Sequence, residues 1–218
     1  MALRYSATVR GSTVLPAIWL VSDARNDARL EAALERLPRG SGFIYRHYHL
    51  PGPERLAQFL ALRRIARARG HVVILADSAL TGAEWGADGI YAAPRALWPR
   101  RAGLLHLATA HDLGEIGLAN RLGADAVLLS PVYPTRSHPG AKTLGPVRFR
   151  LLAARSRVPV IALGGMDERG AQRLEWPRWA AIDGLTRAPR PAARGLTGSR
   201  RGFMVRSHQE ANPWPAAR

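Results

Sequence analysis

The feature that most constrains the fold is an eightfold alternation between short apolar runs and stretches with helical spacing. Each run is continuously apolar, which is typical of parallel strands whose two faces are both covered by helices. The runs lie at residues 17–21, 42–45, 71–75, 88–91, 104–108, 126–129, 158–163 and 179–182. Helices are expected over residues 26–37, 53–70, 78–85, 112–121, 146–156 and 167–174, with about one helical turn within 92–103.

Eight such units predict an α/β fold, a compact (β/α)8 TIM barrel of about 170 residues. An open doubly wound sheet is the alternative, but no G-x-G-x-x-G sequence comes after the first run to support its dinucleotide site. We expect residues 1–16 to form a flexible leader and residues 17–186 to form the barrel. Residues 187–218 are rich in Arg, Pro and Gly and are expected to be a disordered basic tail.

Composition narrows the class of protein further. The chain has no cysteine, which excludes disulfides, thiolate catalysis and zinc–thiolate sites and fits a cytoplasmic protein. No run of 18 apolar residues occurs, so no membrane span is expected. The net charge of +16 would suit a protein that binds nucleic acid, but no alternation of aromatic and basic residues accompanies it. Residues 187–218 alone hold seven Arg and one Glu, so only nonspecific attraction to polyanions is expected.

The stretch after the sixth run combines restricted backbone with polar side chains. It reads Ser130-Pro131-Val132-Tyr133-Pro134-Thr135, in which two prolines hold the chain extended. In a barrel the βα loops build the functional site, so groups placed just after strands are the candidates. The hydroxyl and cationic side chains of this stretch are candidates for binding an anionic substrate: Thr135, Arg136, Ser137, His138 and Lys142, the only lysine in the chain. The alternative is that the stretch is an ordinary surface loop.

Other strand ends carry further candidates, each with a simpler alternative. Gly164 and Gly165 let backbone N–H groups approach a phosphate, but a tight turn also uses glycines. His111 can transfer protons near neutral pH, or it can begin a helix bonded to a neighbour. Arg46 is a candidate anion clamp. Asp77 is a candidate magnesium ligand, or a helix cap.

The strand ends, taken in order, resemble those of the thiamine phosphate synthase family, which also contains the thiazole tautomerases. The matching pieces are WLVSD, FIYR, VVILAD, GADGIY, ATAH, SPVYPT and ALGGM, within residues 17–182. The pairing of SPVYPT with ALGGM is the most specific part. The resemblance implies a (β/α)8 transferase of thiamine biosynthesis that couples hydroxymethylpyrimidine diphosphate to thiazole phosphate. It also implies release of pyrophosphate and use of Mg²⁺.

The chain departs from the family pattern where the diphosphate and metal are held. The strand-two motif Gln-x-Arg-x-Lys keeps only Arg46, and the strand-three Asn-Asp is Ala76-Asp77. The second magnesium aspartate falls at about Ala96. The Thr-x-Thr-Lys grip on pyrophosphate becomes Thr135-Arg136-Ser137-His138, and the Val-Ser phosphate turn after strand eight becomes Ile182-Asp183.

Three functions therefore stay open from the sequence. The first is the synthase, with Asp77 as the remaining metal candidate. The second is a thiazole tautomerase with His111 as acid and base, which needs neither a metal nor ionisation of a diphosphate. The third is a non-catalytic protein that binds a phosphorylated ligand. The expected partners are phosphorylated small molecules, and a homo-oligomer is open as well.

Overall fold

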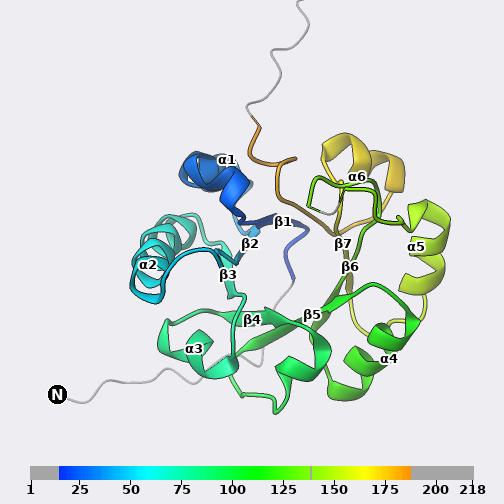
Figure 1. The fold of residues 1–218 in the computed structure, drawn as a ribbon, viewed down its shortest axis with the longest axis horizontal. Coiled ribbons are helices and arrows are strands. Elements are labelled where there is room, and N and C mark those ends of the chain that lie inside the picture. Colours follow the sequence, from blue (N-terminus) through cyan, green and yellow to red (C-terminus); the bar gives the residue numbers. More distant parts are fainter. Residues whose placement is uncertain (1–14, 138, 188–218) are drawn as a thin grey trace, which may run out of the picture. The chain divides into compact units, whose positions relative to one another are not determined.

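A closed parallel barrel forms the centre of the molecule (Figure 1). The computed structural model describes residues 15–137 and 139–187. Each strand pairs with the next along the chain, and β8 returns to β1, where Ile18 lies opposite Trp179. The predicted (β/α)8 barrel is confirmed, and the open sheet was the wrong alternative. The strands are β1 Ile18–Val21, β2 Gly42–Tyr45, β3 Val72–Leu75, β4 Gly89–Ala92, β5 Leu105–Ala110, β6 Ala126–Leu129, β7 Val160–Ala162 and β8 Trp179–Ala181.

Helices in the connections form a ring outside the strands (Figure 1). Asp112 and Asp167 begin two of them, because each side chain accepts a hydrogen bond from a backbone N–H of the first turn. The connection from β4 to β5 holds only a short 3₁₀ helix, as its two prolines predict. The helices are η1 Ala24–Arg29, α1 Leu30–Arg36, α2 Gly52–Ala68, α3 Ala79–Glu84, η2 Pro94–Leu97, α4 Leu113–Leu122, α5 Gly145–Ala153 and α6 Glu168–Leu174, where η denotes 3₁₀.

The apolar strands supply two layers of core. One buried cluster takes residues from every strand and fills the barrel interior, with Trp19, Ile44 and Leu128 among its members. Two other clusters join the opposite strand faces to the surrounding helices. Both faces of each strand are therefore covered, which is the physical reason that the runs are continuously apolar.

The predicted leader and tail lie outside the described residues, apart from residues 15, 16 and 187, so both stay predictions. After β8 the described chain continues through a turn to Arg187. Within the described ranges, no helix has the length and apolar character needed to cross a membrane.

Candidate active site

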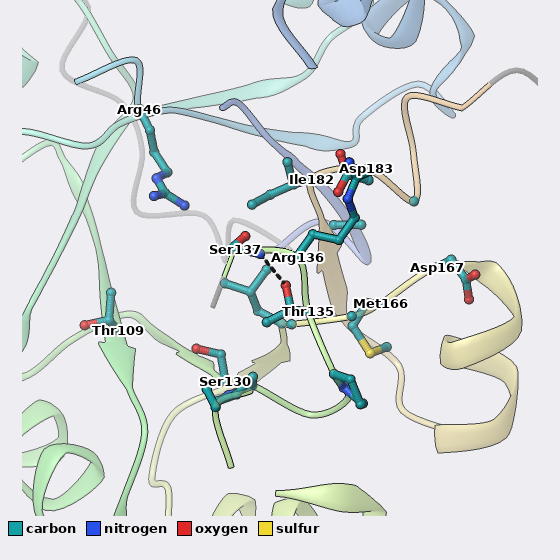
Figure 2. A pocket seen from close by; sticks show the side chains of 18 of the residues that line it. Arg46, Thr109, Ser130, Thr135, Arg136, Ser137, Met166, Asp167, Ile182 and Asp183 are labelled. Atoms are coloured by element: carbon teal, nitrogen blue, oxygen red, sulfur yellow. Dashed lines mark hydrogen bonds between the residues drawn. The ribbon is translucent and has the colours of Figure 1, made fainter. Parts of the chain in front are cut away.

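A cavity of about 530 Å³ opens at the carboxyl ends of the strands (Figure 2). Its wall comes from β4, β5, β8 and the segments after β2, β5, β6, β7 and β8. Because the carboxyl ends of parallel barrel strands share one face, residues far apart in sequence meet there. Seven of the residues singled out from the sequence line this cavity: Arg46, His111, Thr135, Arg136, Ser137, Gly164 and Gly165.

Two other predicted site residues are not brought into the cavity, and a third cannot be placed. Lys142 is exposed and lines a separate, open depression next to Arg136. Asp77 is absent from the cavity wall. His138 lies outside the described residues, so its part in the site stays a prediction.

The turn after β7 is shaped by the loop that comes after β6. Gly164 and Gly165 both have positive φ, 94° and 62°. A Cβ on Gly164 would lie 2.6 Å from the Cα of Pro131, and one on Gly165 would lie 2.4 Å from the carbonyl oxygen of Pro134. The two loops are also joined by a hydrogen bond from Tyr133 N–H to the Gly164 carbonyl, 3.0 Å. Only glycine fits both positions, for conformation and for space.

This turn also leaves backbone donors at the cavity. Among the described residues, the N–H groups of Gly164, Gly165 and Gly184 have no hydrogen-bond acceptor. Gly184 comes after β8, and a Cβ there would lie 2.3 Å from the carbonyl oxygen of Met166. The turns after β7 and β8 therefore pack together with free donors on the cavity wall, the arrangement that suits a phosphate in these barrels.

Asp183, just after β8, is countered by Arg25. The Nη1 of Arg25 lies 3.6 Å from the Oδ2 of Asp183, its Nε lies 2.8 Å from Asp23, and its Nη2 donates to Ser137 at 2.7 Å. One guanidinium thus ties together the loops after β1, β6 and β8. Burial would raise the pKa of Asp23, but hydrogen bonds from Arg25 and the charge of Arg25 outweigh it and lower that pKa.

Two arginines that form no ion pair among the described residues line the cavity. Figure 2 shows Arg46 reaching from the end of β2 toward the middle of the site, across from Thr109 and Ser130. Its guanidinium carbon lies 5.7 Å from the ring centroid of Tyr48. Arg136 lines the same cavity, and in the described chain neither arginine forms an ion pair with a carboxylate. Both charges are available to an anionic ligand.

His111 is held by a carboxylate at the edge of the cavity. Its Nδ1 lies 2.9 Å from the Oε2 of Glu115, and its backbone N–H donates to the same oxygen at 2.7 Å. Glu115 lies one turn along α4, so a short stretch of sequence orients the ring. The Nε2 of His111 has no hydrogen-bond partner among the described residues. The imidazole can therefore exchange a proton with a ligand while Glu115 fixes its orientation.

Asp77 is engaged by Arg55. Arg55 Nη1 donates to Asp77 at 2.5 Å, Nη2 donates to the Ala76 carbonyl at 3.0 Å, and Nε donates to the Arg46 carbonyl at 3.1 Å. Burial would raise the pKa of Asp77, but hydrogen bonds from Arg55 and from the N–H of Ser78 hold it below its ordinary value.

The residues at this strand end do not fit a protein-bound Mg²⁺. Magnesium requires oxygen ligands in octahedral geometry, commonly from one or two carboxylates with water and phosphate. The carboxylate of Asp77 is already paired with a guanidinium, and Ala96, in η2, has no side-chain ligand atom. We therefore assign no step of the chemistry to a metal at Asp77.

Among the cavity residues with no role assigned from the sequence are Thr109, Ser130, Met166 and Gly184. Thr109 is the only hydroxyl residue of β5, and Ser130 is the first polar residue after the apolar run of β6. Both positions could have been found by counting to the end of each strand. Met166 and Gly184 offered no such signal, because an apolar residue and a glycine are common in any loop.

Comparison with known proteins decides the family. A family model described as thiamine monophosphate synthase matches residues 18–176, most of the chain. The chain belongs to this family. Membership confirms the resemblance seen in the strand ends and assigns the chain to the transferase enzymes of thiamine biosynthesis.

Individual relatives of the thiamine monophosphate synthase family are moderately similar. A thiamine-phosphate synthase of Chlorobium luteolum is 35% identical over 157 residues, covering 65% of this chain and 72% of that protein. One of Methylococcus capsulatus is 28% identical over 159 residues, covering 69% and 70%. A solved thiamine phosphate pyrophosphorylase of Pyrococcus furiosus superimposes with a TM-score of 0.64 at 21% identity, covering 76% of this chain and 85% of that one. The last likeness supports the fold.

Proposed function

We propose that this protein is a thiamine phosphate synthase, which joins hydroxymethylpyrimidine diphosphate to thiazole phosphate and releases pyrophosphate. The observation that carries the proposal is one cavity that combines glycines with free N–H groups and two arginines without a carboxylate partner. These two kinds of donor match the two phosphorylated substrates of such a reaction.

The chemistry divides between the backbone donors and the two arginines. The turns at Gly164, Gly165 and Gly184 bind the monophosphate of the thiazole through backbone N–H groups. Arg46 and Arg136 bind the diphosphate. The bond between the pyrimidine methylene carbon and the diphosphate oxygen breaks, and the electron pair leaves with pyrophosphate. The thiazole nitrogen then bonds to that carbon. The guanidinium charges stabilise the leaving group as its negative charge develops.

The test is formation of thiamine phosphate from both substrates by the purified full chain, followed by chromatography, with and without Mg²⁺. We expect product, and we expect Arg46→Ala to lower kcat/KM by about ten- to a hundredfold through loss of a charge-assisted contact. Arg64→Ala is the matched control, because Arg64 is exposed on α2 and does not line the cavity. Absence of product under all these conditions would reject the synthase.

A second function, thiazole tautomerase, is favoured by the His111–Glu115 pair at the cavity edge. In this reaction one imidazole removes a proton from the ring of the thiazole carboxylate and returns it at another atom. Glu115 orients His111 and stabilises the imidazolium that forms. This chemistry needs no contact with a diphosphate. The absence of the family residues that hold the diphosphate and the metal therefore does not affect it.

The tautomerase is tested by monitoring isomerisation of the phosphorylated thiazole carboxylate by NMR. His111→Ala should abolish detectable isomerisation, since a general acid–base group contributes on the order of 10²–10⁴. Glu115→Gln should slow it by about tenfold, because the ring of His111 would lose its charged orienting partner. If neither reaction occurs while thiazole phosphate still binds, the protein is a non-catalytic member that binds a phosphorylated ligand. Cytoplasmic location and a homo-oligomeric state stay predictions.

A further inference from the structure

A second group of ligand-type side chains lies outside the cavity, between η1 and the loop after β2. It consists of Asp27, His47 and His49, whose ligand atoms all lie within 4.8 Å of one another. None of the three lines the cavity. The side chain of His47 is buried, with the residue 1% exposed, and its ring centroid lies 5.0 Å from that of His49.

Two of these side chains are oriented by further partners. The Nδ1 of His47 lies 2.8 Å from the Oγ of Ser22, and its Nε2 lies 3.1 Å from the Oδ1 of Asp27. Gln58 donates to the same Asp27 oxygen at 2.5 Å, and its own Oε1 accepts from the hydroxyl of Tyr45 at 2.8 Å. Outer partners that fix the orientation of each ligand are typical of metal sites in proteins.

We propose that Asp27, His47 and His49 bind a late first-row divalent metal ion, for which Zn²⁺ is the probe. Two imidazoles and one carboxylate suit this class of metal, whereas Mg²⁺ prefers oxygen ligands alone. With the ring proton of His47 on Nδ1 and donated to Ser22, the lone pair of Nε2 points toward Asp27 and can bind an ion held between them. Asp27 and His49 supply the second and third ligands, and water takes the fourth position.

The proposed metal site shares the loop after β2 with Arg46, the candidate anion clamp. Arg46 and Tyr48, which flank His47 in sequence, both line the cavity. An ion held by His47, His49 and Asp27 joins this loop to η1. Metal binding itself does not depend on the proposed synthase reaction, so the two proposals can fail separately.

The experiment uses the untagged full chain, stripped of metal by a chelator. Zn²⁺ binding is measured by calorimetry, and Co²⁺ binding by visible absorption. We expect one ion per chain with micromolar affinity, and no displacement by excess Mg²⁺. His49→Ala and Asp27→Asn should each weaken Zn²⁺ binding by about tenfold or more and alter the Co²⁺ spectrum.

The variants avoid the buried member of the site and replace its two more accessible residues. His49 is exposed, so its replacement leaves the fold intact, whereas a change at buried His47 could unfold the chain. Glu31→Gln is the matched control, because it removes an exposed carboxylate from α1, four residues beyond Asp27. Lack of stoichiometric Zn²⁺ binding by the unaltered chain would overturn the proposal. So would equal affinity in His49→Ala, Asp27→Asn and Glu31→Gln.

Discussion

The arginines at the strand ends fall into two groups, according to whether a carboxylate lies close enough to form an ion pair. Arg46 and Arg136 face the cavity without an acidic partner in the described chain, whereas Arg25 and Arg55 pair with aspartates at strand ends. The first pair can bind a ligand, and the second pair holds loops together. In a chain this rich in arginine, composition alone cannot separate the two groups, because the distinction depends on neighbours far apart in sequence.

The Arg55–Asp77 pair gives a prediction about stability. Asp77→Asn should lower the free energy of unfolding by about 1–3 kcal/mol, because the guanidinium of Arg55 would lose its charged partner. The side chain of Arg55 is only 11% exposed, so water can replace the lost contact only in part. Urea denaturation measures the change.

Glu84→Gln serves as the control for Asp77→Asn, since Glu84 is exposed at the end of α3 and should change stability by no more than about 0.5 kcal/mol. Titration of both variants with Mg²⁺ distinguishes a structural from a metal-binding carboxylate. A variant at Asp77 that keeps full stability but loses Mg²⁺ binding would contradict our assignment.

At the scale of elements, the site depends on contact between the ends of β6, β7 and β8. The loop after β6 lies against the β7 turn, where Val132 N–H donates to the Leu163 carbonyl at 2.9 Å. Glycine is required at Gly164 and Gly165 by these contacts, and the same glycines line the cavity with N–H groups that have no acceptor among the described residues. In the proposed phosphate site, packing and ligand binding constrain the same positions.

Gly165→Ala tests that double constraint. We expect a loss of about 2–4 kcal/mol of unfolding free energy, from a positive φ and from the clash with Pro134 and Tyr133. Phosphate binding should fall with it. Gly52→Ala is the control, because a Cβ there meets nothing within 4 Å, and alanine favours the helix α2. Calorimetric melting reports both, and equal melting temperatures for the two variants would refute the packing argument.

At the scale of the whole molecule, charge governs the response to acid. The pKa values of Asp23, Asp77 and Asp125 are all lowered in the folded protein: burial opposes the change, and hydrogen bonds and ion pairs outweigh it. Asp125 accepts from the His106 N–H at 2.7 Å and from Arg100 at 3.0 Å. Protonation of all 16 acidic residues and all 7 histidines in acid would also raise the net charge from +16 to +39, because 16 negative charges disappear and 7 positive charges appear.

These shifts predict instability below about pH 4. A carboxyl with a lowered pKa stabilises the fold above its unfolded value of 3.8 and loses that contribution as pH falls through its folded pKa. The melting temperature should therefore change little from pH 7 to 5 and fall steeply below 4. Asp125→Asn should be less stable at pH 7 and lose less stability in acid. The same acid dependence in Asp125→Asn and the unaltered chain would argue against this account.

The order of strands and helices could be predicted because it depends on local patterns. The eight apolar runs each match a strand to within a few residues, and Asp112 and Asp167 cap helices as their positions indicate. Seven candidate site residues were found from their positions just after the predicted strands, a rule that needs only the fold class. His138 and the basic tail lie outside the described residues.

The sequence by itself determined the barrel, the family and the face on which the site is built, because periodicity and strand-end motifs are local properties. The tertiary structure alone decided which charges are paired. It brought Arg55 to Asp77 across 22 positions, and Arg25 to Asp183 across 158. The loop that opens with Ser130-Pro131 marked the family, but its role beside Gly164 and Gly165 results from barrel closure, since charge pairing and loop contact depend on distance in space.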